Sequence, residues 1–107
     1  MLFAKVKTQF EALHYWPDAP NFLRNPHRHI FHVEVMVEQK HTDRDIEYFK
    51  FKHFLEAEIK ERFAGKKFKL SCEDIAVDIK DFVMDKYRDR KIIVEVNEDG
   101  ENGAVIM

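Results

Sequence analysis

The first part of the chain alternates between apolar and polar side chains with a period of two. In residues 2–14 most even positions are apolar, and most odd positions carry charged or amide side chains. The alternation returns in residues 27–37 and 92–98, and a short, mostly apolar stretch ends the chain at 104–107. Because a period of two places alternate side chains on opposite faces of a strand, the pattern predicts three half-buried strands and a short fourth one.

Two segments in the middle of the chain space their apolar residues by three and four positions instead. In the first, Phe51, Leu55 and Ile59 recur among charged residues, and the pattern stops near Gly65. The second segment starts at Ser71, a residue type that caps helices well, and acidic residues follow it in the first turn. This spacing is typical of amphipathic helices, so we predict two helices between the second and third strands.

The predicted elements follow the order ββααββ, with strands and helices segregated along the chain. Such segregation favours the α+β class, here a four-stranded antiparallel sheet with both helices on one face. Prolines and asparagines interrupt the strand pattern in residues 15–26, which we predict to be a loop. A length of 107 residues suits a single domain, and we expect it to span residues 1–107.

Composition narrows the class of protein. Eighteen basic and twenty acidic residues give a formal charge of −2 without long runs of either sign, which argues against a nucleic-acid partner. Cys72 is the only cysteine, so no disulfide can form within the chain, as is usual in a reducing cytosol. The first ten residues lack the continuous apolar stretch of a signal peptide or membrane span. We therefore expect a soluble, cytoplasmic protein without a membrane partner.

Three histidines fall in the apolar phase of the predicted strands. His27 and His29 lie two residues apart and so point the same way, and His14 ends the first strand in the matching phase. If the two strands are neighbours, the imidazoles can bind one metal ion, and three histidines with a water molecule form a catalytic type of zinc site. The same residues could instead be core or rim histidines, each satisfied by a backbone carbonyl. Spacing alone leaves both interpretations open.

Short motifs along the chain resemble, in the same order, those of the 6-pyruvoyl-tetrahydropterin synthase and 6-carboxytetrahydropterin synthase family. Residues 10–14, F-E-A-L-H, resemble the F-x-A-x-H of its first strand, and residues 27–29, H-R-H, resemble its H-G-H. Weaker likenesses to V-x-D-F, T-x-E-N, V-x-V-x-E and the short final strand lie at residues 46–48, 71–74, 94–98 and 103–106. The resemblance covers nearly the whole chain.

The resemblance implies a metal, a substrate and an assembly. It implies Zn²⁺ at His14, His27 and His29, and a pterin-like substrate such as dihydroneopterin triphosphate, acted on by a carbon–oxygen lyase. It implies the tunnelling fold, in which small sheets pack side by side into barrels, and hence a homo-oligomer, a hexamer built from trimers. It further implies that Glu98 anchors the pterin ring, since a carboxylate can accept both N–H groups of an aminopyrimidine edge. From the sequence alone, a solvated strand end before a turn is the more common setting for a residue such as Glu98.

The chain departs from the family where proton-transfer groups belong. The family's catalytic cysteine stands four residues before the first histidine of H-G-H, and here that position is Leu23. Cys72 does not replace it, because it starts the second helix and is interpreted as a small buried apolar residue. The family's L-D-H-x-x-L-N segment between the helices has no counterpart here. The nearest carboxylates in the sequence, Glu11 and Asp18, match no motif, so the catalytic residues are unknown.

These departures leave two functional hypotheses from different classes. The first is a zinc-dependent, pterin-synthase-like enzyme that acts on a 6-substituted dihydropterin. The second is a non-catalytic relative that binds a pterin or purine, or serves as an assembly subunit. The intact set of histidines favours the enzyme, whereas Leu23 favours the binding protein. A structural domain whose histidines bind nothing is the third possibility.

Overall fold

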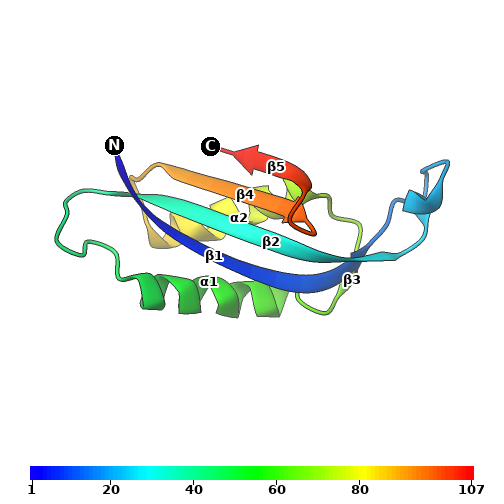
Figure 1. Ribbon diagram of the computed structural model, residues 1–107, viewed down its shortest axis with the longest axis horizontal. Helices are drawn as coiled ribbons and strands as arrows, with labels where there is room; N and C mark the ends of the chain where they lie inside the picture. The colour runs from blue at the N-terminus through cyan, green and yellow to red at the C-terminus, as the bar shows by residue number, and fades with distance from the viewer.

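The computed structural model describes all 107 residues, which form one curved sheet with two helices packed against it (Figure 1). The sheet has five strands in the order β3-β1-β2-β4-β5. The elements are β1 (Leu2–His14), the 3₁₀ turn η1 (Phe22–Arg24), β2 (His27–Gln39), α1 (Tyr48–Arg62), β3 (Lys67–Phe68), α2 (Cys72–Lys86), β4 (Ile92–Glu98) and β5 (Asn102–Ile106).

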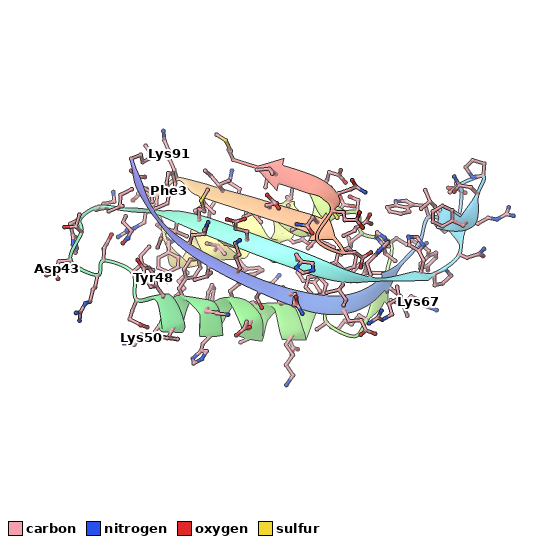
Figure 2. The ribbon with its side chains drawn as sticks, in the orientation of Figure 1. Phe3, Asp43, Tyr48, Lys50, Lys67 and Lys91 are labelled. Atoms are coloured by element: carbon pink, nitrogen blue, oxygen red, sulfur yellow. The ribbon has the colours of Figure 1, made fainter.

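The antiparallel pair of β1 and β2 forms the long axis of the molecule. Its register runs without a break from the pair Leu2 and Gln39 at one end to the pair His14 and His27 at the other. Twelve steps of about 3.3 Å separate the two ends of each strand by roughly 40 Å. In Figure 2, the loop after β2, marked by Asp43, and strand β3, marked by Lys67, lie at opposite ends of the molecule. Groups at one end therefore cannot act together with groups at the other.

Both helices cover the same face of the sheet. Residues that pair directly across β1, β2 and β4 point to the same face of the sheet. On the side of the helices, these strand residues and apolar residues of the helices form one cluster of 22 buried residues. The helices contribute apolar side chains at helical spacing, namely Phe51, Leu55 and Ile59 from α1 and Ile75, Ile79 and Val83 from α2. The opposite face is polar, with an ion pair of 3.2 Å between Lys5 and Glu34.

The second helix begins where the sequence predicts. The Asp74 N–H donates to Ser71 Oγ and the Ser71 N–H donates to Asp74 Oδ2, each over 3.1 Å, so the two residues form a capping box. Helix α1 starts at Tyr48, earlier than the apolar spacing indicates, because Glu47 caps it by accepting the Lys50 N–H over 2.7 Å. Neither α1 nor α2 has the length and apolar composition that a membrane-spanning helix requires.

The α+β class with two helices is confirmed, but the sheet differs from the predicted one. It has five strands instead of four, and it is mixed, because Lys67 and Phe68 form a strand parallel to the end of β1. A two-residue strand is too short to have a recognisable period, so the alternation of side chains could not reveal it. Phe68 pairs with His14, which means that β3 supports the end of β1 where the histidines lie.

An ion pair at the far end joins the loop after β2 to the segment before β4. Arg90 donates to Asp45 from Nη1 over 2.5 Å and from Nη2 over 3.3 Å, and Asp45 also accepts the Lys40 N–H over 2.8 Å. The hydrogen bond from Arg90 is the main reason why the pKa of Asp45 falls from 3.8 to about 2. The folded state therefore binds the Asp45 proton less readily than the unfolded chain does.

We expect Asp45 to make the stability of the fold depend on pH. A carboxyl group whose pKa is lower in the folded state stabilises the fold at pH values above its unfolded pKa of 3.8. This stabilisation is lost as the pH falls toward the folded pKa of about 2. Asp45→Asn should lower the urea midpoint at pH 7 and flatten the decline of stability between pH 4 and pH 2. Asp43→Asn, in the same loop but exposed, is the control and should leave both unchanged. Equal pH profiles for wild type and Asp45→Asn would contradict the assignment.

Candidate metal centre

The three histidines meet at one end of the sheet, on the face that the helices cover. His14 pairs directly with His27 across β1 and β2, and His29 pairs with Ala12 two residues further along. Their ring centroids lie 4.5 Å apart for His14 and His27, 5.0 Å for His14 and His29, and 5.1 Å for His27 and His29. Each ring offers one nitrogen to a set whose members all lie within 4.8 Å of one another. The register of one hairpin thus assembles the cluster predicted from the sequence.

Backbone carbonyls orient two of the rings. His14 donates from Nδ1 to the Leu70 carbonyl over 2.9 Å, and His27 donates from Nδ1 to the Asn25 carbonyl over 2.8 Å. A carbonyl can only accept, so Nδ1 carries the proton and Nε2 is left with its lone pair in the neutral ring. Both Nε2 atoms are buried and have no hydrogen-bond partner in the chain. A buried polar atom without a partner costs about 1–3 kcal/mol, and a metal ion would remove this cost.

A carboxylate orients the third ring. His29 donates from Nδ1 to Asp99 Oδ2 over 2.7 Å, and Asp99 Oδ1 accepts the Ile30 N–H over 2.9 Å. The hydrogen bond from His29 lowers the pKa of Asp99, which keeps this group an acceptor. Asp99 has a φ of 58° and Gly100 a φ of 77°, as the tight turn between β4 and β5 requires. A carboxylate behind a histidine is a frequent companion of metal ligation, because it sets the tautomer and the direction of the ring.

Burial keeps the innermost ring neutral. His14 is 0% exposed, and burial is the main cause that lowers its pKa, while the Leu70 carbonyl acts in the opposite direction. Metal ions bind the neutral imidazole, so a histidine that resists protonation suits a ligand. Trp16 and Phe31 pack around His14 with ring centroids 4.7 and 5.2 Å away. This shell holds the ring in place and shields it from water.

Glu98 reaches the same point from β4. It pairs with Phe31, so its side chain lies on the face of the histidines. Its Oε2 is 3.0 Å from His14 Nε2 and 3.5 Å from His29 Nε2, although neither contact is a hydrogen bond. Glu98 thus approaches His14 and His29, while the set of ligand atoms that all lie within 4.8 Å of one another consists of the three histidines alone.

A cavity of about 290 Å³ adjoins this cluster on the Glu98 side. Its lining combines the loop after β1, the start of α2 and the turn between β4 and β5, with residues Trp16, Ser71, Cys72, Glu73, Glu98, Asn102 and Gly103. The lining contains two carboxylates and no basic side chain, so it suits a ligand rich in hydrogen-bond donors. Burial raises the pKa of Cys72 to about 12, so this cysteine remains a thiol.

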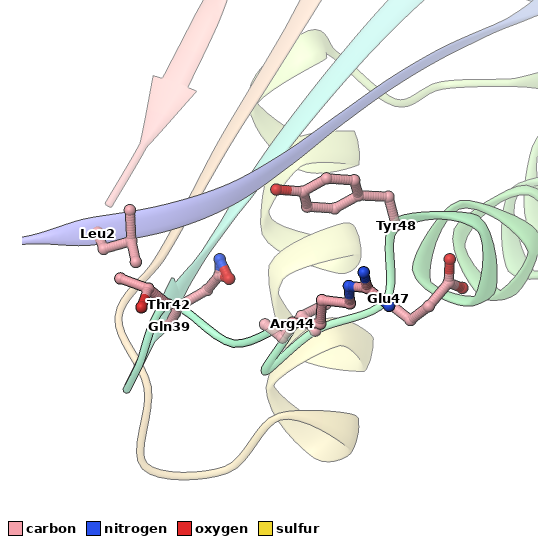
Figure 3. A pocket seen from close by; sticks show the side chains of 7 residues that line it. Leu2, Gln39, Thr42, Arg44, Glu47 and Tyr48 are labelled. Atoms are coloured by element: carbon pink, nitrogen blue, oxygen red, sulfur yellow. The ribbon is translucent and has the colours of Figure 1, made fainter.

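A larger cavity, of about 460 Å³, lies at the opposite end of the sheet (Figure 3). It is lined by the beginning of β1, the end of β2 and the segment that enters α1, including Leu2, Gln39, Arg44 and Tyr48. No cluster of possible metal ligands lies there. Convergent donors with perturbed pKa values mark a functional site better than volume does, so we place the candidate site at the histidines.

The structure also places the carboxylates considered as general bases. Glu11 is exposed on the polar face of the sheet and forms a paired contact with Arg28, with distances of 2.8 and 2.9 Å. Asp18 is exposed in a turn. Neither carboxylate is among the groups that converge with the histidines. Leu23 is half-buried in η1, where its carbonyl accepts the Trp16 N–H over 2.7 Å.

Sequence reasoning missed Asp99 and the two carbonyls that orient the rings. Asp99 follows Glu98 directly and precedes Gly100, so its position in a turn was recognisable. Its contact with His29 depends on the pairing of β2 with β4, which side-chain alternation does not reveal. No family model matches the chain, and no curated protein matches it.

Proposed function

We propose that this chain is a zinc-binding, pterin-synthase-like protein whose metal ligands are His14, His27 and His29. The observation that carries the proposal is the convergence of one ring nitrogen from each of the three histidines, together with the buried, unpartnered Nε2 atoms of His14 and His27. Three histidine nitrogens suit a zinc site with one remaining position. Bound zinc would polarise an oxygen of the substrate side chain and so ease removal of a neighbouring proton.

We further propose that a 6-substituted dihydropterin binds in the adjoining cavity, with its aminopyrimidine edge on Glu98. The cavity, at about 290 Å³, is close to the lower end of small-molecule sites, which begin at roughly 300 Å³. Trp16 offers an aromatic wall, and Glu98 offers two acceptor oxygens for a pair of N–H groups. The side chain of the ligand would then extend toward the histidines.

The proposal covers two alternatives, an enzyme and a non-catalytic binding protein. A carbon–oxygen lyase of this type needs a general base, and no titratable group occupies the position of Leu23. Burial of Cys72 excludes a ready thiolate in the cavity. A relative that binds a pterin or purine without turnover, or acts as an assembly subunit, is therefore the second candidate, favoured by Leu23.

Binding of a pterin tests the proposed ligand. Neopterin, which carries no phosphate, should bind to the zinc-loaded wild type, and Glu98→Gln should weaken binding about tenfold or more, because hydrogen bonds to a charged acceptor contribute about 1.5–3 kcal/mol each. Isothermal titration calorimetry measures both constants. Glu95→Gln is the matched control, since Glu95 lies on the same strand but faces away from the cavity. Equal affinities for wild type and Glu98→Gln would remove Glu98 as the anchor.

The assembly is a separate part of the proposal. We propose a tunnelling-fold homo-oligomer, a hexamer built from trimers. The edge strand β5 supports it, because its outer side is free of a neighbouring strand and its Val105 side chain is 61% exposed. Light scattering at micromolar concentration should report a mass near six chains. A clean monomer would contradict the expected assembly but leave the metal site untouched.

A further inference from the structure

Glu98 stands closer to the histidines than the role of a ring anchor requires. One of its oxygens, Oε2, lies 3.0 Å from His14 Nε2 and 3.5 Å from His29 Nε2. His14 donates from Nδ1 to the Leu70 carbonyl and His29 donates from Nδ1 to Asp99, so Nε2 is the nitrogen of each ring that faces the Glu98 oxygen. A carboxylate oxygen and two imidazole nitrogens, all of them atom types that bind metal ions, thus lie close together.

These distances match those between ligands of one metal ion. Bonds of about 2.0–2.1 Å at a tetrahedral ion place neighbouring ligand atoms roughly 3.3–3.4 Å apart. The two measured distances, 3.0 and 3.5 Å, lie on either side of that value. A carboxylate oxygen is an ordinary zinc ligand, and its negative charge offsets part of the charge of a buried cation.

The turn after β4 holds the carboxylate in this position. Asp99 donates its N–H to the Ile30 carbonyl over 2.7 Å, and its side chain accepts the Ile30 N–H in return. The Glu101 N–H donates to the Glu98 carbonyl over 3.0 Å. Two successive residues of one turn therefore act on His29 from opposite sides, Asp99 at Nδ1 and Glu98 at Nε2.

We infer that Glu98 is the fourth metal ligand of the ligand-free protein, which closes the site as a three-histidine, one-carboxylate centre. The inference rests on the proposed metal site, and it also limits how Glu98 can act as the proposed anchor of the pterin ring. Glu98 cannot hold the metal and an aminopyrimidine edge through the same oxygen. Binding of the ring therefore withdraws the carboxylate from the metal and opens a position for an oxygen of the ligand.

Metal affinity and coordination test this inference without a measurement of activity. Competition with a chelator should show that Glu98→Gln binds Zn²⁺ at least tenfold more weakly than wild type, since changes of outer-shell partners already cost about 10–100-fold. Glu95→Gln, which removes the same charge on the polar face of β4, should keep the wild-type affinity. The visible spectrum of the Co²⁺-loaded protein should differ between Glu98→Gln and wild type.

A second measurement uses the wild type alone, so it does not depend on how the variant folds. Addition of neopterin to the Co²⁺-loaded wild type should change the visible spectrum, because one ligand of the ion is exchanged. Equal Zn²⁺ affinity and equal Co²⁺ spectra for wild type and Glu98→Gln would overturn the inference while leaving the three-histidine site intact. A wild type that binds neopterin with no spectral change would overturn the exchange. Failure of the wild type to bind metal at all would overturn the proposed function together with this inference.

Discussion

Replacement of His29 by alanine is expected to lower the affinity for Zn²⁺ by more than a hundredfold. The substitution removes one of the three converging nitrogens, so that only two histidines and the inferred ligand Glu98 would remain to hold the ion. Changes in outer-shell partners alone cost about 10–100-fold in metal affinity, and the loss of a ligand exceeds that range. His29 is a better choice than His14, because its side chain is 21% exposed and its removal disturbs the core less.

Thermal unfolding gives an independent reading of the same loss. A ligand that binds only the folded state stabilises it by about 2.7 kcal/mol at a concentration one hundred times its dissociation constant. Excess Zn²⁺ should therefore raise the unfolding temperature of the wild type and leave that of His29→Ala nearly unchanged.

The matched control is His32→Ala. His32 lies on the same strand but on the opposite face of the sheet. The His32→Ala variant should therefore bind zinc, and be stabilised by it, as the wild type is. An undiminished zinc response in His29→Ala, or an equal loss in His32→Ala, would show that the cluster is not the metal site.

The alternation of side chains predicted the strands and the phase of the histidines, because both depend only on neighbouring residues. It placed His14, His27 and His29 on one face, and the structure adds the register that brings His14 opposite His27. The capping box at Ser71 was recognisable for the same reason, since its two hydrogen bonds join residues three positions apart.

The features that escaped prediction depend on pairing between distant segments. Glu98 reaches the histidines because β4 pairs with β2 in a register that sets it opposite Phe31. A period of two is compatible with several such registers, so it cannot select this one. Strand β3 escaped for a different reason, since it has only two residues and depends on its contact with the end of β1. The side chains of the site were thus foreseen better than the contacts that orient them.

The proposed enzyme would have its metal ligands but no titratable group at the position of Leu23, and the expected consequence is slow turnover. Positioned general bases contribute typically 10²–10⁴-fold to a rate. The zinc-loaded wild type should therefore consume dihydroneopterin triphosphate about 10²–10⁴-fold more slowly than a pterin synthase that has its base. Liquid chromatography of the remaining substrate measures this rate, and a rate typical of the family would mean that another residue supplies the base.

Leu23→Cys is expected to restore part of that activity. Leu23 lies four residues before His27, in a loop that is tied to the site at two points. The Phe22 ring lies 5.8 Å from the His27 ring, and the Leu23 carbonyl accepts the N–H of Trp16, whose own ring packs on His14. A thiol at this position would be half-buried in the loop that contacts the proposed metal site, and a nearby positive charge lowers the pKa of a thiol.

The control for this variant is Leu13→Cys, which adds a thiol on the polar face of β1, away from the histidines. An increase in rate for Leu23→Cys alone, lost again when the thiol is alkylated, would identify the chain as an enzyme that lacks only its base. If both variants bind neopterin as the wild type does and neither consumes the substrate, the non-catalytic hypothesis holds. In that case the histidines, Glu98 and the cavity serve binding, because a site with a metal, a ring anchor and a supplied base would otherwise turn over.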